Sequence, residues 1–344
     1  MHYCGLDVSM KSTHVYIENA QGRRARQAVI ETTPAALETV LTPYLEGGLK
    51  VAIEAGGQTA WIVDVLREIG AKVHVVHPMK VKWIAESKKK TDRVDARLLA
   101  DLLRIDALPE PVHMPTARSR ELRALLVARR QLVQMRTRLV NVVRGLLRQH
   151  RITIRTRALL TGRGWQQLTS AELAPAVREI VAAYQTTVAT TTAALKALDR
   201  RLEERAHADA RVARLETIPG VGRVSAQTLV AAVDRIERFR SAKKLVAYSG
   251  LVPSVRASGE RVEYGRITKQ GRSEIRAVWV QAAHATLAVK APAARPLQQW
   301  CERVAKRRGK KTAIVALARK LLTIAFHLLR EQTTYDPRRL RSAA

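Results

Sequence analysis

The N-terminal part of the chain alternates between short apolar runs and amphipathic stretches with helical periodicity. Pro34 is favourable in the first turn of the first such helix. The predicted strands are 2–7, 14–17, 26–31, 49–53 and 72–76, and the predicted helices are 33–46 and 58–69. Three strands, a helix, a strand, a helix and a strand indicate an α/β fold of RNase-H-like order. We assign it to a domain spanning residues 1–112.

The middle of the chain changes to a heptad pattern, which predicts two long helices in a coiled-coil connector over residues 113–210. Residues 161–164 interrupt the pattern and predict a loop at the tip of a helical hairpin. The helices fold back on each other, pair with a second subunit, or do both. The two apolar seams are Leu125, Ala128, Leu132, Met135, Leu139, Val142 and Leu146, then Val177, Val181, Tyr184, Val188, Thr191, Leu195, Leu198 and Leu202.

The C-terminal part, residues 211–335, is predicted to be a mainly α domain. A glycine turn at 218–222 precedes an apolar helix over 225–233 and resembles a helix-hairpin-helix turn. A polar, glycine-rich stretch over 249–271 follows, then a helix from about Ser273 and a last basic helix near 310–329. The tail beyond Asp336 is expected to fray.

Charge separates this chain from most enzymes of small molecules. It carries 61 Lys and Arg against 30 acidic residues, a net charge of +31, and such self-repulsion is relieved by a polyanion, usually nucleic acid. Between Thr116 and Trp165 there are thirteen arginines and one acid, Glu121. A ribosome-like or merely highly charged surface is the alternative. Aromatic residues are only 4% of the chain, so base stacking is not expected to be the main mode of binding.

Cysteines and the N-terminus indicate the compartment. Cys4 and Cys301 have no partner spacing, so neither a disulfide framework nor a zinc site is expected, which fits a reducing cytoplasm. The N-terminus lacks the pattern of a signal peptide, and no run of about 18 apolar residues predicts a membrane span. We expect a cytoplasmic protein with no membrane partner.

Four carboxylates are candidate metal ligands: Asp7, Glu54, Asp92 and Asp95. Asp7 and Glu54 each end a predicted strand, and RNase-H-like order makes those strands neighbours. Asp92 and Asp95 are three residues apart and share one helix face. Mg²⁺ takes oxygen ligands, and two such ions stabilise the attacking and leaving oxygens of a phosphodiester displacement. Alternatively, Asp92 caps its helix and Asp95 pairs with a neighbouring cation.

Several motifs in order resemble those of insertion-sequence transposases of the IS110 family. The acidic motifs are 5–9, 53–55 and 90–96, and the C-terminal motifs are 218–222, 248–253 and 265–271. The resemblance covers nearly the whole chain. It implies a RuvC-like domain over 1–112, a coiled-coil connector over 113–210, and a transposase domain with a catalytic serine over 211–335. It further implies recombination guided by a structured bridge RNA that pairs with donor and target DNA.

The resemblance assigns the nucleophile to Ser258, because the serine of the corresponding Ser-Gly step in that family attacks DNA. The residue lies in a polar turn close in sequence to several cations, as a hydroxyl that approaches a phosphate requires. By its residues alone Ser258 reads as a turn residue, and Ser254 and Tyr264 are kept in reserve. We expect Mg²⁺ held by the four acids to act on the same phosphate, across subunits of a dimer or tetramer.

Nucleic-acid contacts are predicted at glycines and at basic clusters. The glycine turn would let backbone N–H groups approach a phosphate at the start of a helix, although an ordinary turn has the same pattern. The cluster over 303–311 contacts a phosphate backbone or is a solvated linker. The residues assigned to nucleic-acid binding are Gly220, Gly222, Arg266, Lys269, Arg272, Arg307, Arg308 and Lys310.

The expected function is therefore that of a Mg²⁺-dependent DNA recombinase that forms a transient phosphoserine. Its expected partners are donor and target DNA, a bridge RNA and further copies of the chain. One rival is a RuvC-like nuclease that uses water as its nucleophile. Another is a non-catalytic nucleic-acid-binding scaffold, for which neutralising Asp7 or Asp92 would leave activity in cells unchanged.

Overall fold

The structure is a computed structural model that describes residues 1–80, 92–169, 171–258 and 261–339, and at 92–94, 169, 257–258 and 261–262 the backbone alone. The chain forms two compact units, Met1–Pro115 and Thr116–Ala344, which are described separately. The sequence-based division at residues 112 and 210 remains a prediction.

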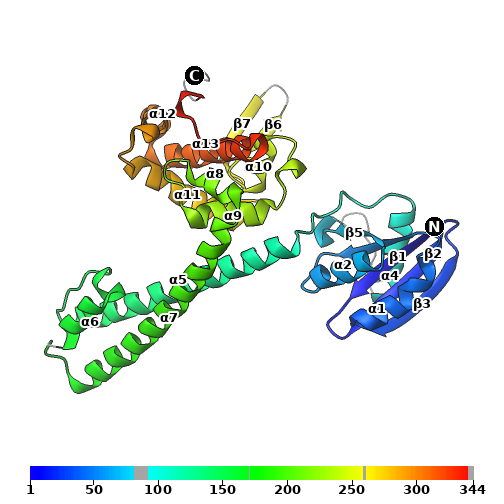
Figure 1. Ribbon diagram of the computed structural model, residues 1–344, viewed down its shortest axis with the longest axis horizontal. Coiled ribbons are helices and arrows are strands. Elements are labelled where there is room, and N and C mark those ends of the chain that lie inside the picture. The colour runs from blue at the N-terminus through cyan, green and yellow to red at the C-terminus, as the bar shows by residue number, and fades with distance from the viewer. Residues whose placement is uncertain (81–91, 170, 259–260, 340–344) are drawn as a thin grey trace. The chain divides into compact units, whose positions relative to one another are not determined.

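The first unit is a five-stranded mixed sheet with helices on both faces (Figure 1). Its strand order is β3-β2-β1-β4-β5; β2 is antiparallel to β1 and β3, whereas β4 is parallel to β1 and β5. The predicted strands and helices occur in the predicted order. They are β1 (His2–Val8), β2 (Ser12–Asn19), β3 (Arg24–Glu31), α1 (Pro34–Leu41), β4 (Leu49–Glu54), α2 (Thr59–Glu68) and β5 (Lys72–Val76), followed by α4 (Asp92–Arg104).

The two faces of this sheet bury different side chains, because successive residues of a strand point to opposite sides. Leu6 of β1 and Ile53 of β4 pack with α1 and α2 in one cluster. On the other side Ala52 packs with Leu99 and Leu103 of α4. Helix α4 therefore covers the face opposite α1 and α2, where it contacts β1, β2 and β4.

The second unit contains two long helices that pack along each other, α5 (Ala117–Gln149) and α7 (Pro175–His207). The predicted seam of α7 is confirmed, since Val177, Val188 and Leu202 are among its buried residues. The seam predicted for α5 is partly wrong. Its buried residues are Leu122, Val140, Val143 and Leu147, with Ser119.

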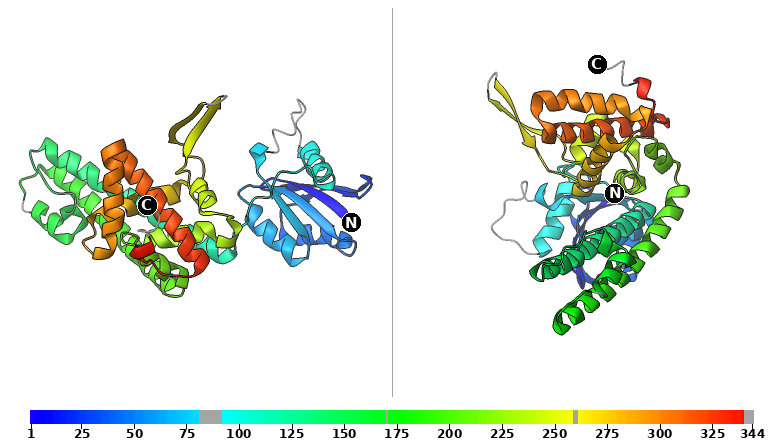
Figure 2. Two further views of the ribbon diagram at one scale, coloured as in Figure 1. Left: turned by 90° about the horizontal axis from the view of Figure 1, so that it is seen from above. Right: turned by 90° about the vertical axis from the view of Figure 1, so that its left-hand side faces the viewer.

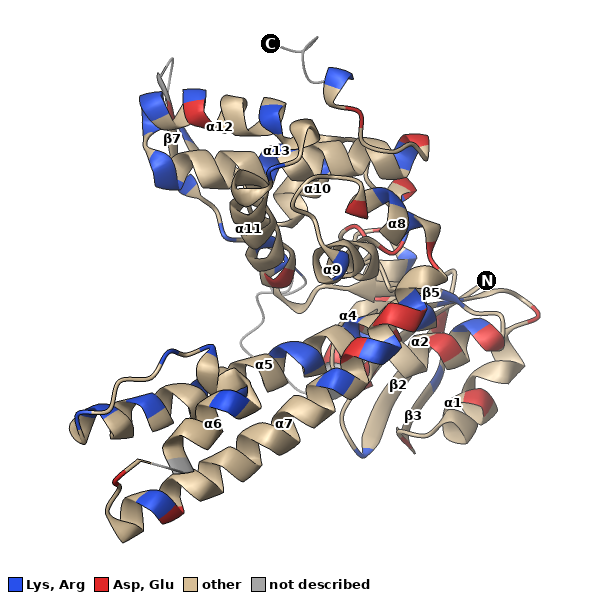
Figure 3. Cartoon of the chain, turned by 60° about the vertical axis from the view of Figure 1, so that its left-hand side comes forward, with Lys and Arg blue, Asp and Glu red and all other residues tan. Residues whose placement is uncertain are grey.

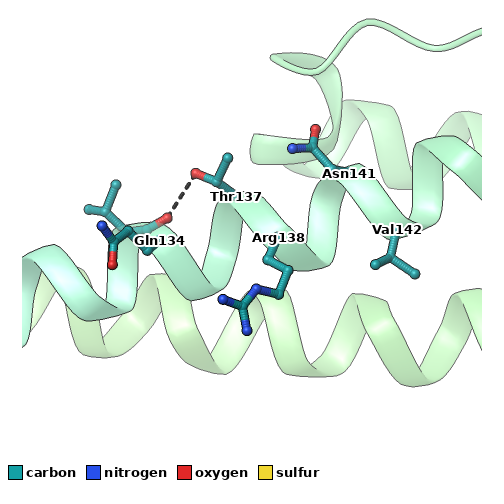
Figure 4. Close-up of a pocket in the computed structure, with 6 residues that line it drawn as sticks. Gln134, Thr137, Arg138, Asn141 and Val142 are labelled. Atoms are coloured by element: carbon teal, nitrogen blue, oxygen red, sulfur yellow. Dashed lines mark hydrogen bonds between the residues drawn. The ribbon is translucent and has the colours of Figure 1, made fainter.

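In the second half of α5 the buried positions lie one residue after the predicted ones: Val140, Val143 and Leu147 are buried in place of Leu139, Val142 and Leu146. Leu125, Leu132, Leu139 and Leu146 are partly buried, but Ala128, Met135 and Val142 are exposed. Figure 4 shows Arg138 and Val142 on one side of this helix and Thr137 and Asn141 on another. A helix with leucine or valine at adjacent positions has two overlapping apolar stripes, and only the packing partner selects one of them.

The predicted loop over 161–164 is also wrong, because α6 (Gly162–Thr169) begins there. A Cβ atom on Gly164 would overlap the Ala158 carbonyl, so this glycine lets α6 pack against the preceding turn, η2 (Ala158–Leu160). Trp165 Nε1 donates to the Leu159 carbonyl at 2.9 Å. Gly164 therefore marks close helix packing, in a connection between α5 and α7 that is partly helical where a loop was predicted.

The rest of the second unit is mainly helical, as predicted, around a core that includes the buried Trp279. The sequence did not predict the strands β6 (Pro253–Ser258) and β7 (Arg261–Ile267), whose hairpin extends from the helices (Figures 1 and 2). The helices are α8 (Ala210–Glu216), α9 (Arg223–Val233), α10 (Ala242–Tyr248), α11 (Ser273–Ala288), α12 (Arg295–Arg308) and α13 (Lys310–Glu331).

Helix α13 forms much of this core. Its length and composition alone would allow it to cross a membrane, but half of its most apolar window is buried inside the fold. Core helices of soluble proteins can have the same length and composition, so this helix is only weak evidence for a membrane span.

Candidate active site and nucleic-acid interface

Asp7 and Glu54 lie on one face of the sheet, at the ends of neighbouring strands. In the parallel pair of β1 and β4, Gly5 is opposite Ala52 and Leu6 is opposite Ile53. Ala52 packs against α4, so Glu54, two residues further, is on the same face. Gly5 also faces α4, which places Asp7 on that face as well. The strands that carry these two carboxylates are therefore neighbours, as expected from the sequence, and the register places both residues on one face.

Helix α4 brings Asp95 to the same face. A Cβ atom on Gly5 would overlap the carbonyl oxygen of Ala96, so only glycine allows the helix to approach β1 this closely. Asp95 directly precedes Ala96 and is partly buried. Asp92 begins the helix, one turn earlier, and its side chain lies outside the described residues.

The donor chemistry of this face fits a hard divalent cation, because its acidic groups are carboxylates. Among the described side chains, no three His, Cys, Asp or Glu groups approach closely enough to hold one metal ion. Asp7, Glu54 and Asp95 each take part in an interaction within the fold. The fit to a metal therefore rests on the kind of ligand and the shared face.

His14 is a residue of this face that sequence reasoning missed. It lies directly opposite Asp7 in the antiparallel pair of β1 and β2, where the Cβ atoms of opposed residues are typically about 5 Å apart. Tyr16, two residues on, packs against Ala96 and Ala100 of α4, so His14 faces the same side. The signal was available in the hairpin pairing, but it required the register of that hairpin.

A buried ion pair fastens the last turn of α4 to the sheet, at the end of β1 opposite to Asp7. Arg104 Nε lies 2.7 Å from Glu18 Oε1, and the Glu18 side chain is fully buried in β2. Burial raises the pKa of Glu18 and the charge of Asp101 adds to that rise, whereas Arg104 opposes it. Because Arg104 also pairs with Asp101 at 3.8 Å, the last turn of α4 is held at β2.

The predicted nucleophile lies on the β6–β7 hairpin. Ser258 is the last residue of β6 and pairs with Arg261, but its side chain is outside the described atoms. Of the reserve candidates, Ser254 is exposed and its hydroxyl lies over Gly265, where a Cβ atom would overlap it. Tyr264 is 72% exposed and lies on β7 opposite Val255, the residue that follows Ser254.

The base of this hairpin is held by contacts between the two segments that carry the C-terminal motifs. A Cβ atom on Gly271 would overlap the Tyr248 carbonyl, and its φ of +107° favours glycine. Arg276 Nη1 donates to the carbonyls of Ser249 at 2.9 Å and Lys269 at 3.2 Å. The motif residues therefore fix the point from which β6 and β7 leave the helices.

Arg272, predicted to bind nucleic acid, is partly buried and engaged within the fold. Its Nε donates to Tyr248 Oη at 3.0 Å, and its Nη1 lies 3.3 Å from Glu274 Oε1. Burial by itself raises the pKa of Tyr248, but the charges of Arg272 and Arg238 and their hydrogen bonds outweigh burial and lower that pKa. Arg272 thus has a structural partner in addition to any phosphate.

The two glycines of the predicted helix-hairpin-helix turn have different surroundings. Gly220 has a φ of +88° and abuts Thr286 of α11, whose Oγ1 donates to the Pro219 carbonyl at 2.7 Å. Close packing therefore explains glycine at this position. Gly222 caps the start of α9 and is exposed, with open space where a Cβ would lie. Phosphate binding by this turn remains a prediction.

The other predicted nucleic-acid contacts are exposed cations. Arg266 and Lys269 lie at the end of β7 and just beyond it, and Arg307, Arg308 and Lys310 lie where α12 meets α13. Among the described acidic groups, none forms an ion pair with any of these five cations. They are therefore accessible to a polyanion.

Two family models match the chain. A transposase model of the DEDD IS110 type matches residues 4–152, and a second, described as transposase IS116/IS110/IS902 family, matches residues 212–299. The first match spans the three described acids of the sheet face, and the second spans the β6–β7 hairpin and the motif residues at its base.

Two curated transposases match over most of this chain, and a gene-inverting protein matches over a smaller part of it. The transposase for insertion sequence element IS1111A of Coxiella burnetii is 28% identical over 96% of this chain and 87% of its own length. A probable family 20 transposase of Pseudomonas aeruginosa is 29% identical over 83% of this chain and 86% of its own. The pilin gene-inverting protein of Moraxella bovis is 32% identical over 37% of this chain and 39% of its own.

Proposed function

The chain belongs to the IS116/IS110/IS902 family of transposases, and from that premise we propose that it recombines DNA through a covalent phosphoserine at Ser258. Its first unit would be an RNase-H-like, RuvC-like domain that binds Mg²⁺ through Asp7, Glu54, Asp92 and Asp95. The similarity to a pilin gene-inverting protein supports strand exchange in addition to cleavage.

The observation that carries this proposal is the placement of acids on one sheet face. Asp7 and Glu54 end neighbouring parallel strands, and α4, the helix that carries Asp95, packs against Gly5 on the same face. The metal would supply stabilisation of the attacking and leaving oxygens of the phosphodiester. Asp92 is the fourth proposed ligand because it precedes Asp95 by one turn of the same helix.

The proposed chemistry of Ser258 is a transesterification. The bond from Ser258 Oγ to phosphorus forms as a phosphorus–oxygen bond of the DNA breaks, the serine loses its proton, and the departing sugar hydroxyl gains one. A hydroxyl of another strand then attacks the phosphoserine and releases the side chain. The number of phosphoester bonds is unchanged, so strand exchange needs no external energy source.

The proposed partners follow from charge and from the family. A net charge of +31 suits a protein that holds nucleic acid in the cytoplasm, including donor DNA, target DNA and a bridge RNA. The reaction requires the acids and Ser258 to reach one phosphodiester. In a homo-oligomer, a dimer or tetramer, the two groups can come from different copies of the chain.

The test is covalent trapping in cells that carry a plasmid with the insertion sequence and its native flanking DNA. Rapid denaturation should recover protein attached to DNA for the unaltered chain and not for Ser258→Ala. Ser254→Ala, on the same strand, is the matched control and should retain the adduct. Asp7→Asn and Glu54→Gln should lower recovered recombination junctions at least about a hundredfold.

Each other outcome contradicts a defined part of the proposal. An adduct that persists in Ser258→Ala would exclude that serine as the nucleophile. Free DNA ends without attached protein would favour the RuvC-like nuclease that uses water. Recombination that is unchanged in Asp7→Asn and in Asp92→Asn would leave only a nucleic-acid-binding scaffold.

A further inference from the structure

A groove lies in the second unit between the base of the β6–β7 hairpin and the helices α12 and α13. It has a volume of about 900 Å³, and five cations and one aromatic ring line it: Arg266, Lys269, Lys311, Arg319, Lys320 and Trp300. No Asp or Glu is among the described residues that line it. We call it the basic groove, and we propose that it binds the sugar–phosphate backbone of a nucleic-acid strand.

Like charges gather here without described counterions. Lys311 and Arg319 are exposed on one face of α13, two steps of four residues apart, and Arg266 and Lys269 face them from β7 and the residues beyond it. No described acidic side chain forms an ion pair with any of the five cations. Such clustering costs free energy unless an anion occupies the groove.

Lys320 shows the effect most directly, because it is partly buried in the groove. Its Nζ lies 4.8 Å from the centroid of the Trp300 ring. Burial lowers the pKa of Lys320, and the charge of Arg303 lowers it further. A bound anion would reverse both effects by pairing with the ammonium group.

The spread of the cations selects among anions. Lys311 and Arg319 are eight residues apart, which corresponds to about 12 Å along a helix. One phosphate group cannot pair with both ends of such a row, whereas a backbone with regularly repeated phosphates can. Apolar lining residues, including Ile267 and Val315, suit sugars and base edges between those phosphates.

The groove is continuous with the strand that pairs with β6. Gly265, Arg266 and Ile267 line it and belong to β7, whereas Ser258 ends β6. A strand held in the basic groove would thus run toward the hairpin that carries the proposed nucleophile. This inference rests on the proposed function for its ligand class, and it adds Arg319, Lys320 and Trp300 to the residues predicted from sequence.

The test compares two triple variants of the full chain that remove the same charge. Arg266→Gln, Lys311→Gln and Arg319→Gln alter three exposed cations of the basic groove. Arg23→Gln, Arg24→Gln and Arg26→Gln alter three exposed cations in the first unit and are the control. Affinity is measured against salt concentration with mixed-sequence oligonucleotides, as single-stranded DNA, duplex DNA and single-stranded RNA.

In the groove variant, the plot of log affinity against log salt should become less steep. The magnitude of its slope should fall by about 2 to 3 with at least one of these probes. The control should lower it by less than about 1. The probe with the larger loss identifies whether DNA or RNA occupies the groove. Equal losses in the two variants with every probe would overturn the proposal.

A lysine-acylation footprint provides a second measurement that requires no substitution. The oligonucleotides should protect Lys311 and Lys320 and leave Lys11 reactive. Polyglutamate is the comparison probe. If it protects Lys311 and Lys320 from acylation and none of the nucleic acids does, the groove binds an acidic protein segment and the proposal is refuted.

Failure of the groove and failure of the nucleophile are distinguishable. Ser258→Ala should keep the full salt slope, since it leaves all five cations in place. A normal slope in the groove variant would refute the basic groove even if phosphoserine is trapped. A lowered slope would support it even if no adduct forms.

Discussion

At the residue scale, single side chains connect the proposed acidic site to the stability of the first unit. The Glu18 side chain is fully buried, and among the described residues Arg104 is the cation that pairs with it, at 2.7 Å. A buried carboxylate without a partner costs far more than an exposed ion pair contributes. The helix that carries Asp95 is thus held by an interaction that lies outside the proposed site.

Arg104→Ala should lower the free energy of unfolding by about 3 kcal/mol, because it leaves the carboxylate of Glu18 buried without its cation. Urea denaturation measures the change. Arg97→Ala on the same helix, an exposed residue paired with Asp101 at 3.5 Å, is the control and should cost less than about 1 kcal/mol. Equal costs for the two variants would contradict this account; adding Glu18→Gln to Arg104→Ala should recover stability.

Tyr248 should ionise below the ordinary tyrosine value of 10.0, since Arg272 and Arg238 lower its pKa despite burial. The sign follows from linkage. Because the pKa is lower in the fold, ionisation stabilises the folded state above pH 10.0, and that contribution is lost as the pH falls through the lowered pKa.

Ultraviolet titration of phenolate absorbance provides the measurement. The unaltered chain should show one tyrosine that ionises early, and Tyr248→Phe should remove that step. Arg272→Met should move the step toward higher pH. An unchanged titration curve in Tyr248→Phe would show that the early step belongs to another tyrosine or does not exist.

At the scale of elements, two interfaces decide where the candidate groups lie. The first is the contact of α4 with β1, which exists only because position 5 carries no side chain. The second is the pairing of α5 with α7, which extends to α9 through a cluster of Leu122, Leu202 and Ala231. The contacting residues named here, Gly5 and the three-residue cluster, are not themselves proposed metal ligands or nucleophiles, so they can be altered without removing a reacting group.

Gly5→Ala should displace α4 from β1, because the added Cβ overlaps the Ala96 carbonyl. We expect recombination in cells to fall at least about tenfold and stability to fall by about 2 kcal/mol, as overpacking typically costs. Gly57→Ala is the matched control, since open space surrounds that position. Wild-type recombination by Gly5→Ala would show that the position of α4 does not matter to the reaction.

Leu202→Ala should lower the free energy of unfolding by about 2 to 4 kcal/mol, because this side chain is only 2% exposed. Met135→Ala, a member of the predicted seam that is 50% exposed, should cost less than about 1 kcal/mol. Chemical denaturation of the two variants compares the observed seam with the predicted one. A larger cost at Met135 would indicate that a second copy of the chain covers that face.

At the scale of the whole molecule, the charge and the candidate chemistry are divided between two units. The acids lie within Met1–Pro115, and the hairpin with the basic groove lies within Thr116–Ala344. Lys and Arg occur along α5 and gather where β7 meets α12 and α13 (Figure 3). We expect the excess positive charge to attract nucleic acid over a distance before the acids or the serine act on it.

That attraction should make binding strongly dependent on salt. If six or more phosphates are contacted, affinity for mixed-sequence DNA should fall about a thousandfold between about 50 and about 200 mM salt. Fluorescence anisotropy over that range measures it. A change of less than about tenfold would mean that the excess charge is not used to bind the phosphate backbone.

The order of elements in the first unit and the helical character of the second could be read from the chain, because periods of two and of three to four residues report which face is buried. The same local pattern identified Asp7 and Glu54 as strand ends. It could not separate the overlapping apolar stripes of α5, in which Met135 and Val142 are exposed. It also missed the β6–β7 hairpin, whose strands are polar and largely exposed.

What only the tertiary structure decided is the set of approaches between distant segments. Gly5 meets Ala96, His14 lies opposite Asp7, and Lys311 joins Arg266 in one groove. These contacts depend on strand register and on which helix covers which face of the sheet. Both are decided when apolar surfaces from distant parts of the chain are buried against one another. The residue types in the sequence indicated nucleic-acid chemistry, whereas the tertiary fold decided which of these residues lie close together.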